Sequence, residues 1–171
     1  MINALFAVDH YGGMGFNGTM PWPHNKQDLA NFKELTMGHI VVIGRTSWED
    51  KNFPKPLPGR LTYVVTNQPF ARPADTFSIK GDLKEELLKL EKQYPNKTIW
   101  VVGGPNVLEQ CEGVLDRLYL THYKGSYKID TKLNLKSFLT GWSQKTATCD
   151  PKTNFTTVVY EHLFKRIKTG S

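Results

Sequence analysis

Short apolar runs, rich in β-branched residues, alternate along the chain with segments in which apolar residues recur at helical spacing. The apolar runs predict strands over Ile2–Asp9, His39–Gly44, Leu61–Asn67, Asp75–Lys80, Thr98–Gly104 and Asp116–Gly125. The helical spacing predicts helices over Lys26–Thr36, Asp82–Tyr94 and Pro105–Cys111. Because strands that alternate with helices form βαβ units, the pattern favours a mainly parallel sheet with right-handed crossovers.

The last third of the chain has a different pattern. Two longer alternating segments, residues 142–150 and 155–167, are separated by Pro-Lys-Thr-Asn, which favours a turn, so they predict an antiparallel hairpin at the sheet edge. The expected fold is therefore a single α/β domain over residues 1–171. It has a central mixed, mainly parallel twisted sheet with a C-terminal antiparallel hairpin, and helices on both faces. The basic tail, from about residue 166 to residue 171, is expected to be flexible.

The composition is that of a globular protein in a reducing compartment. The 171 residues are 39% hydrophobic and 22% charged, which is ordinary for a domain with its own core. No apolar run approaches the ~20 residues that cross a bilayer, and the N-terminus lacks the pattern of a signal peptide. Cys111 and Cys149 lie far apart and do not suggest a disulfide framework. We therefore expect a cytoplasmic monomer that does not bind membranes.

The charge balance narrows the choice of partners. A formal net charge of +6 and a pI near 9.3 suit an anionic partner, either nucleic acid or a polyanionic small molecule. The basic residues are scattered along the chain, and only the C-terminal segment FKRIKTGS concentrates them. The distribution favours a small anionic ligand and predicts no binding to nucleic acid.

The stretch GGMGFNGTMPWP contains the glycine pattern G-x-G-x-x-G at Gly13, Gly15 and Gly18. This pattern indicates a dinucleotide site only when a helix begins within it. Pro21 and Pro23 prevent such a helix, because each lacks an amide donor and restricts the residue before it. We therefore expect an irregular loop from Gly12 to about His24 rather than a phosphate cradle.

Two later strand-to-helix junctions are better candidates for a phosphate site. In one, the strand ends at Gly103 and Gly104, and a helix follows at once. In the other, Gly44 is followed by Arg45 and by Ser47, which can cap a helix and donate to phosphate. Each alone also fits an ordinary turn. Their joint position at the carboxyl ends of parallel strands favours a ligand site.

Asp28 is a carboxylate on a helix face that otherwise carries apolar residues. It shares that face with Phe32 and Leu35, at spacings of i, i+4 and i+7. An acid in the first helical turn also has a purely structural use, because it complements the helix dipole. An inward-facing carboxylate, however, needs a partner or a ligand that donates hydrogen bonds, and burial raises its pKa towards the range of a proton-transfer group.

Other catalytic arrangements are absent from the sequence. The five histidines make no metal-ligand spacing with one another or with cysteine, so no metal is expected. The chain also lacks a G-x-S-x-G nucleophile turn and a P-loop. A bound organic cofactor is therefore expected to supply the chemistry.

Six segments in order, GGMGFNGTMPWP with QDLANFK, VVIGRTSWE, PLPGR, VVGGPNVLEQ and LYLTHY, resemble the dihydrofolate reductase family. The resemblance continues to the C-terminal YEHLFKR and so covers nearly the whole chain. It implies reduction of 7,8-dihydrofolate to tetrahydrofolate with NADPH, by hydride transfer to the pterin C6 and protonation of N5. It also implies that the glycine-rich stretch is a mobile lid that closes over the nicotinamide and excludes water.

The resemblance further implies a set of catalytic residues: Asp28, Trp22, Thr121 and Met20. Asp28 would anchor the pterin by accepting bonds from N3 and the 2-amino group, and would support protonation at N5. Thr121 would bond to that carboxylate, and Trp22 would hold a water. Arg60 would pair with the α-carboxylate of the glutamate tail. The remaining substrate contacts would come from Leu5, Phe32, Phe53 and Leu57.

For the cofactor, the resemblance places phosphate groups at Arg45 and Ser47 and the 2′-phosphate shelf at Thr66 and Asn67. The full cofactor set is Ala7, Gly13, Gly15, Gly18, Thr19, Arg45, Thr46, Ser47, Thr66, Asn67, Val102, Gly103, Gly104, Pro105, Asn106 and Val107. Asn106 stands where many members carry a basic residue, so the preference for NADPH would depend more on Arg45.

Two alternatives share the expected scaffold. A pyrimidine reductase of riboflavin synthesis also uses NADPH, but it does not require the acidic anchor or the PLPGR arginine. A non-catalytic nucleotide-binding module would be marked by loss of the anchor. Asp28 is present, which favours the first interpretation.

Overall fold

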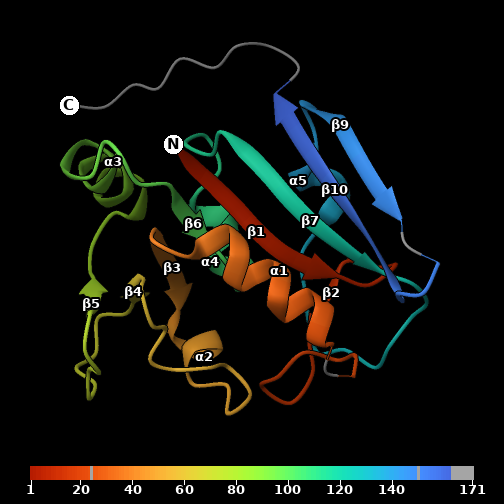
Figure 1. Cartoon of the computed structure of the whole chain (residues 1–171), viewed down its shortest axis with the longest axis horizontal. Coiled ribbons are helices and arrows are strands. Elements are labelled where there is room, and N and C mark those ends of the chain that lie inside the picture. The colour runs from red at the N-terminus through yellow and green to blue at the C-terminus, as the bar shows by residue number, and fades with distance from the viewer. Residues whose placement is uncertain (24, 150, 163–171) are drawn as a thin grey trace.

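A central sheet of eight strands runs through the molecule, in the order β5-β4-β3-β6-β1-β7-β10-β9 (Figure 1). The computed structural model describes residues 1–23, 25–149 and 151–162. The strands of this sheet are β1 (Ile2–Val8), β3 (Ile40–Gly44), β4 (Leu61–Val65), β5 (Thr76–Ile79), β6 (Ile99–Val101), β7 (Arg117–Tyr123), β9 (Trp142–Cys149) and β10 (Phe155–His162). The helices are α1 (Lys26–Thr36), α2 (Arg45–Trp48), α3 (Leu83–Gln93), α4 (Pro105–Gln110) and α5 (Leu135–Phe138).

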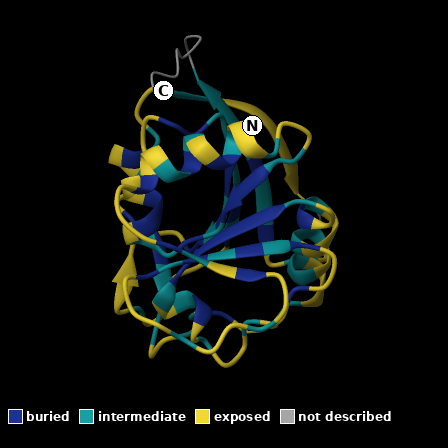
Figure 2. Cartoon of the chain, turned by 90° about the vertical axis from the view of Figure 1, so that its left-hand side faces the viewer, coloured by how far each residue is buried: buried dark blue, intermediate teal, exposed yellow. Residues whose placement is uncertain are grey.

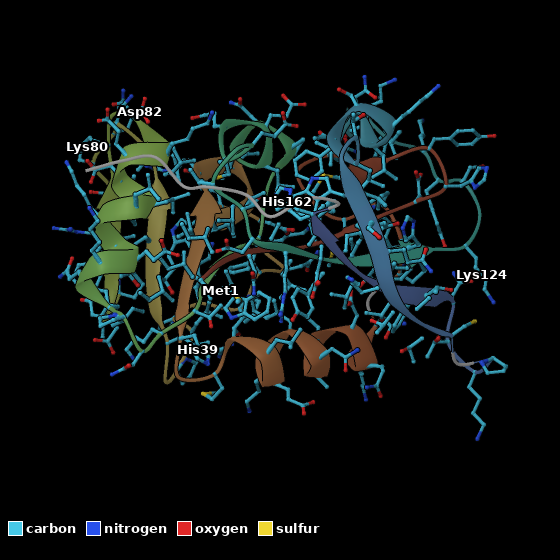
Figure 3. The ribbon with its side chains drawn as sticks, turned by 90° about the horizontal axis from the view of Figure 1, so that it is seen from above. Met1, His39, Lys80, Asp82, Lys124 and His162 are labelled. Atoms are coloured by element: carbon cyan, nitrogen blue, oxygen red, sulfur yellow. The ribbon has the colours of Figure 1, made fainter. Side chains whose placement is uncertain are left out.

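The strand directions confirm the predicted mixed α/β fold. The strands from β5 to β7 pair in parallel, whereas β10 is antiparallel to both β7 and β9. Helix α1 covers one face of the sheet, and α4 and α5 lie on the other (Figure 3). The predicted C-terminal hairpin is present as far as His162, and the rest of it, with the expected tail, lies outside the described residues.

The central strands are buried on both faces, as Figure 2 shows by their dark colour. All five residues of β3 are buried, which is the expected pattern for a parallel strand between two layers of helix. In β1 the pattern is different, because Leu5 and Ala7 are only half-buried. These two residues alternate with buried neighbours, so they share the face that carries the site described below.

The start of α1 has a clear local cause. The Asn25 side chain caps the helix by accepting from the backbone N–H of Gln27 at 2.9 Å and of Asp28 at 3.1 Å. The cap fixes the first turn, so the position of Asp28 is set by the sequence immediately before it.

The prediction of an irregular loop from Gly12 to His24 is wrong in part. Strand β2 (Gly13–Gly15) pairs antiparallel with β8 (Thr131–Lys132) in a second, small sheet. The Asp9 carboxylate accepts from the Gly13 N–H at 2.7 Å. A Cβ at Gly13 would lie 2.7 Å from the Asp9 Oδ2, so this glycine is required for packing.

The prediction that Ser47 caps a helix is also wrong. Helix α2 begins at Arg45, and Gly44 is its N-cap residue. Ser47 therefore lies inside the short helix. Its hydroxyl lies close to Gly104, which follows β6, at 3.3 Å from the position that a Cβ would take there. Among the described residues, no helix is long and apolar enough to cross a bilayer.

Candidate active site

A cleft of about 230 Å³ opens between α1, the segment Met14–Trp22 and the carboxyl ends of β1, β3 and β6. Many of the predicted site residues line it: Leu5, Ala7, Gly15, Gly18, Thr19, Met20, Trp22, Asp28, Phe32, Thr46, Ser47, Phe53, Val102, Gly104, Pro105 and Thr121. The cleft therefore brings together residues from distant parts of the chain. It lies where open α/β sheets bind ligands.

Asp28 is the central polar group of this cleft. Its Oδ2 accepts a hydrogen bond from the Tyr123 hydroxyl at 2.8 Å, and the Thr121 side chain is a second hydrogen-bond partner. Burial raises the pKa of Asp28 above its ordinary value, and the hydrogen bonds from Tyr123 and Thr121 partly oppose that rise. No ion pair to Asp28 forms within the described part of the chain. This carboxyl can accept hydrogen bonds from a ligand or exchange a proton near it.

Trp22 lies against the same group of residues. Its indole ring stacks on the Tyr123 ring with the centroids 4.3 Å apart and the planes 12° from parallel. Trp22 is 5% exposed, and its indole N–H has no hydrogen-bond partner among the described residues. Because a buried N–H without a partner costs free energy, this donor suits a water or a polar ligand atom in the cleft.

Apolar side chains form the walls around Asp28. Phe32, one turn further along α1, meets Phe53 edge to face with the ring centroids 6.3 Å apart. Leu5 and Ala7 face the cleft from β1. The Asp28 carboxyl between aromatic and aliphatic side chains fits a flat, apolar ring that carries hydrogen-bond donors on one edge.

Glycines lie at the end of β3 and directly after β6, and of these Gly104 lines the cleft. The Gly44 N–H donates to the Gly103 carbonyl at 2.7 Å, so the end of β3 touches the segment after β6. A Cβ at Gly44 would lie 2.9 Å from Val107 Cγ2, which leaves no room for a side chain. Gly103 has a φ of +120°, which other residues rarely adopt. Gly44 is therefore required by packing and Gly103 by its backbone conformation, at the place where the sequence predicts the pyrophosphate site.

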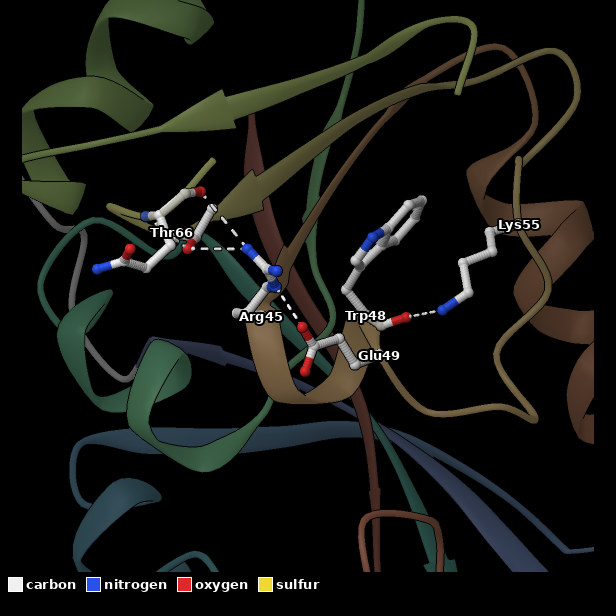
Figure 4. Close-up of polar contacts among 6 residues, drawn as sticks. Arg45, Trp48, Glu49, Lys55 and Thr66 are labelled. Carbon is white, nitrogen blue, oxygen red and sulfur yellow. Dashed lines mark hydrogen bonds and ion pairs between the residues drawn. The ribbon is translucent and has the colours of Figure 1, made fainter. Parts of the chain in front are cut away.

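Arg45, the first residue of α2, lies close to Thr66, which directly follows β4 (Figure 4). Its Nε pairs with Glu49 Oε1 at 2.5 Å, and its Nη1 donates to Thr66 Oγ1 at 3.4 Å and to the Gln68 carbonyl at 3.5 Å. The guanidinium also lies over the Phe70 ring, 5.2 Å from its centroid. The structure therefore brings Arg45 and Thr66, two of the predicted phosphate contacts, together.

Arg60 and Leu57 are both buried, and neither is among the residues that line the cleft. Arg60 is 6% exposed and donates to the Pro58 carbonyl at 3.1 Å and to Thr36 Oγ1 at 3.2 Å. Burial lowers the pKa of its guanidinium. No ion pair to Arg60 occurs among the described side chains. The other predicted residues outside the lining are Gly13, Arg45, Thr66, Asn67, Gly103, Asn106 and Val107.

Two polar contacts at this site involve side chains that the sequence analysis did not assign to it. Tyr123 contacts Asp28, and its position two residues after Thr121 on one strand could have indicated it, because such residues share a face. Asn52 donates to Thr19 Oγ1 at 2.9 Å and so connects the segment after α2 to the predicted lid. No sequence signal identifies that contact. Within the described residues, no three His, Cys, Asp or Glu side chains are close enough to hold a metal ion.

Comparisons with known proteins agree on one family. The family model for dihydrofolate reductase matches residues 1–163. Dihydrofolate reductase type 8 of Escherichia coli is 29% identical over 147 residues, which cover 84% of this chain and 86% of that protein. Dihydrofolate reductase type 9 of Escherichia coli is 33% identical over 144 residues, with 80% and 78% covered.

A solved structure is similar over nearly the full length. It is dihydrofolate reductase from Enterococcus faecalis complexed with NADP(H) and RAB-propyl. The TM-score is 0.80 at 26% sequence identity, and the match covers 96% of this chain and 97% of the other.

Proposed function

The chain belongs to the dihydrofolate reductase family, and from that premise we propose how its side chains divide the work of the reaction. The enzyme is an NADPH-dependent oxidoreductase that reduces 7,8-dihydrofolate to tetrahydrofolate. The single observation that supports the assignment of roles most strongly is the half-buried Asp28 carboxyl in an otherwise apolar wall of the cleft.

Asp28 anchors the pterin. Its carboxylate accepts hydrogen bonds from N3 and the 2-amino group, and the ring packs between Leu5 and Phe32. Phe53 and Leu57 contact the more distant part of the substrate. This arrangement matches a planar ring with donors on one edge, because the Asp28 carboxyl lies among apolar side chains on that wall.

Arg60 holds the glutamate tail of the substrate. Arg60 is 6% exposed, and its guanidinium has no ion pair within the described residues. A buried cation is costly without a counter-charge, and a carboxylate suits the planar fork of an arginine.

The side of the cleft at the carboxyl ends of β3 and β6 holds NADPH, which supplies the hydride for C6 when it is bound. Gly103, Gly104 and Pro105 present backbone to the pyrophosphate, together with Thr46, Ser47, Val102 and Val107. Arg45 and Thr66 contact the 2′-phosphate with Asn67 and Asn106, and the Arg45–Thr66 hydrogen bond places them side by side. Ala7 and the lid residues Gly13, Gly15, Gly18 and Thr19 border the nicotinamide.

The proton for N5 comes from the Asp28 side of the cleft. Because burial raises the pKa of Asp28, its protonated form is more available near neutral pH than that of an exposed acid. The unpartnered Trp22 indole N–H holds a water beside it. Met20 and its neighbours in the lid then exclude bulk water during the reaction.

The test is the loss of absorbance of the reduced nicotinamide in the presence of dihydrofolate. Asp28→Asn keeps the size of the side chain and removes its charge, and we expect turnover to fall by about 10²- to 10⁴-fold at neutral pH. Glu34→Gln, an exposed acid on the same helix, is the matched control and retains turnover. Near-normal turnover of the Asp28→Asn enzyme would refute the assigned role.

We also propose that the enzyme acts as a cytoplasmic monomer on small molecules rather than on nucleic acid. The scattered positive charge and two free cysteines support this proposal. Sedimentation measures the oligomeric state directly. Submicromolar binding of duplex DNA at physiological salt would argue against the second part.

A further inference from the structure

Tyr123 is the strongest contact of Asp28, although its role is separate from those assigned above. The phenol donates to Asp28 Oδ2 at 2.8 Å across a sequence separation of 95 residues. Tyr123 is the last residue of β7 and is 3% exposed. We propose that Tyr123 is a positioning residue, which orients the Asp28 carboxyl through its hydroxyl and is itself fixed by Trp22. This inference rests on the proposed role of Asp28.

The Tyr123 ring is held by aromatic neighbours. Trp22 stacks on it nearly parallel, with the centroids 4.3 Å apart. The Phe155 ring lies 5.4 Å from it, at an angle of 49°, and Phe155 is also the residue paired with Tyr123 in the β7–β10 ladder. Because the ring cannot turn into water without losing these contacts, its hydroxyl stays directed at Asp28. Trp22 thereby links the end of the lid to the anchor.

The hydroxyl acts only as a hydrogen-bond donor to the carboxylate. Burial and the neighbouring Asp28 raise the pKa of Tyr123 far above its ordinary value, so the phenol stays protonated throughout the working range. A donor that faces a carboxylate favours the ionised form. Tyr123 thus opposes the rise in the Asp28 pKa that burial causes.

Few other groups in the cleft could produce the same effect. The ionisable side chains that line it, within the described residues, are Asp28, Asp50 and Tyr119. Asp50 accepts from the Asn52 N–H at 2.9 Å, and Tyr119 packs its ring edge against Trp100. The uncharged Thr121 is the other hydrogen-bond partner of Asp28, and β1 and the lid contribute Leu5, Ala7, Met20 and Trp22.

The experiment compares two tyrosine variants. Tyr123→Phe keeps the ring and its stacking but removes the donor, and Tyr127→Phe is the control. Tyr127 also packs against Trp22, with the centroids 6.1 Å apart, but its hydroxyl accepts from Asn154 at 2.9 Å rather than facing Asp28. The measured quantities are the pH dependence of hydride transfer and the ¹³C chemical shift of the labelled Asp28 carboxyl.

We expect Tyr123→Phe to strengthen proton binding at Asp28 about three- to tenfold, which moves its apparent pKa up by about 0.5–1 unit. We expect Tyr127→Phe to change neither the pH dependence of hydride transfer nor the titration of the Asp28 carboxyl. A fluorinated tyrosine at position 123, a more acidic donor of similar size, moves the Asp28 pKa in the opposite direction. This third protein keeps the ring contacts if Tyr123→Phe folds poorly.

The carboxyl titration separates this inference from the assigned function. It reports on Asp28 even in an enzyme with little activity. An unchanged Asp28 pKa in Tyr123→Phe, or equal shifts in both phenylalanine variants, overturns the positioning role while leaving the anchor intact. Normal turnover of Asp28→Asn, by contrast, removes the anchor and with it the inference.

Discussion

The Asp130 carboxylate accepts a hydrogen bond from the Asn17 backbone N–H at 2.9 Å. In the other direction, the Asp130 N–H donates to the Gly15 carbonyl at 2.9 Å. The bond from Asn17 is the main cause of a lowered pKa at Asp130. The proposed lid is therefore hydrogen-bonded on one side to the segment that precedes β8, and on the other side to Asn52 through Thr19.

Removing the hydrogen bond between Asn17 and Asp130 should make the closed position of the proposed lid less stable. We expect Asp130→Ala to lower kcat/KM for NADPH about three- to tenfold, because the lid spends less time over the nicotinamide. Steady-state kinetics at saturating dihydrofolate measures this effect. Glu85→Ala, which removes an exposed acid on the distant α3, should change nothing, and equal losses in both variants would argue against a specific effect of the hydrogen bond between Asn17 and Asp130.

The main sheet and the long helices could be predicted because their apolar patterns are strong and local. The bounds of α1 agree with the sequence prediction, since Asn25 marks its start in the sequence itself. The β2–β8 pair could not be predicted in this way. Gly13–Gly15 and Thr131–Lys132 are very short and lie far apart in the chain, so only the fold brings them together. The four-residue α5 was missed because it is too short for a helical period.

The same distinction applies to the cleft. Asp28 was identifiable because one carboxylate interrupts an apolar helix face. The spacing of Tyr123 from Thr121 indicates that both lie on one face of β7, but the contact itself depends on how that face lies against α1. The prediction for Ser47 was wrong because several residues near Gly44 could serve as the N-cap of a helix. In the structure the N-cap residue is Gly44 itself.

Asp28 should also reduce the stability of the folded protein at neutral pH. Its folded pKa lies above the ordinary value of 3.8, so the contribution of this group to stability is complete below pH 3.8. That contribution is lost as the pH rises through the raised folded pKa. We therefore expect Asp28→Asn to gain about 1 kcal/mol near neutral pH, as substitutions that relieve an active-site cost commonly do.

Thermal unfolding at a series of pH values checks this expectation. The gain of Asp28→Asn over the unmodified chain should shrink as the pH falls towards 3.8, because both side chains are then neutral. A variant that is less stable at neutral pH, or a gain that does not depend on pH, would contradict the burial of the ionised carboxyl.

Arg45 should control the choice between the two nicotinamide cofactors. Asn106, at the start of α4, provides no positive charge, so we expect the 2′-phosphate to depend on the guanidinium beside Thr66. We expect Arg45→Ala to lower the ratio of kcat/KM for NADPH to that for NADH about 10- to 100-fold. Kinetics with both cofactors measures the ratio.

Glu49→Gln provides the comparison for Arg45. Glu49 Oε1 lies 2.5 Å from Arg45 Nε and competes with a phosphate for the same guanidinium. Removing this negative charge should keep or increase the preference for NADPH. A preference that falls equally in both variants would indicate that the ion pair supports the local fold and that Arg45 does not contact the phosphate.

Arg60 should matter only to substrates that carry the glutamate tail. Its guanidinium is buried, and its bonds to Pro58 and Thr36 leave it without an acidic partner in the described chain. We expect Arg60→Lys, which keeps the charge but loses the planar fork, to raise KM for dihydrofolate about 10-fold with little change in kcat. A 7,8-dihydropterin that lacks the glutamate tail should show the same KM with the Arg60→Lys enzyme and with the unmodified enzyme. If KM for the substrate without the tail rises as strongly as KM for dihydrofolate, the role of Arg60 is structural. Its hydrogen bond to Thr36, which joins the end of α1 to the loop before β4, would then be the contact that matters.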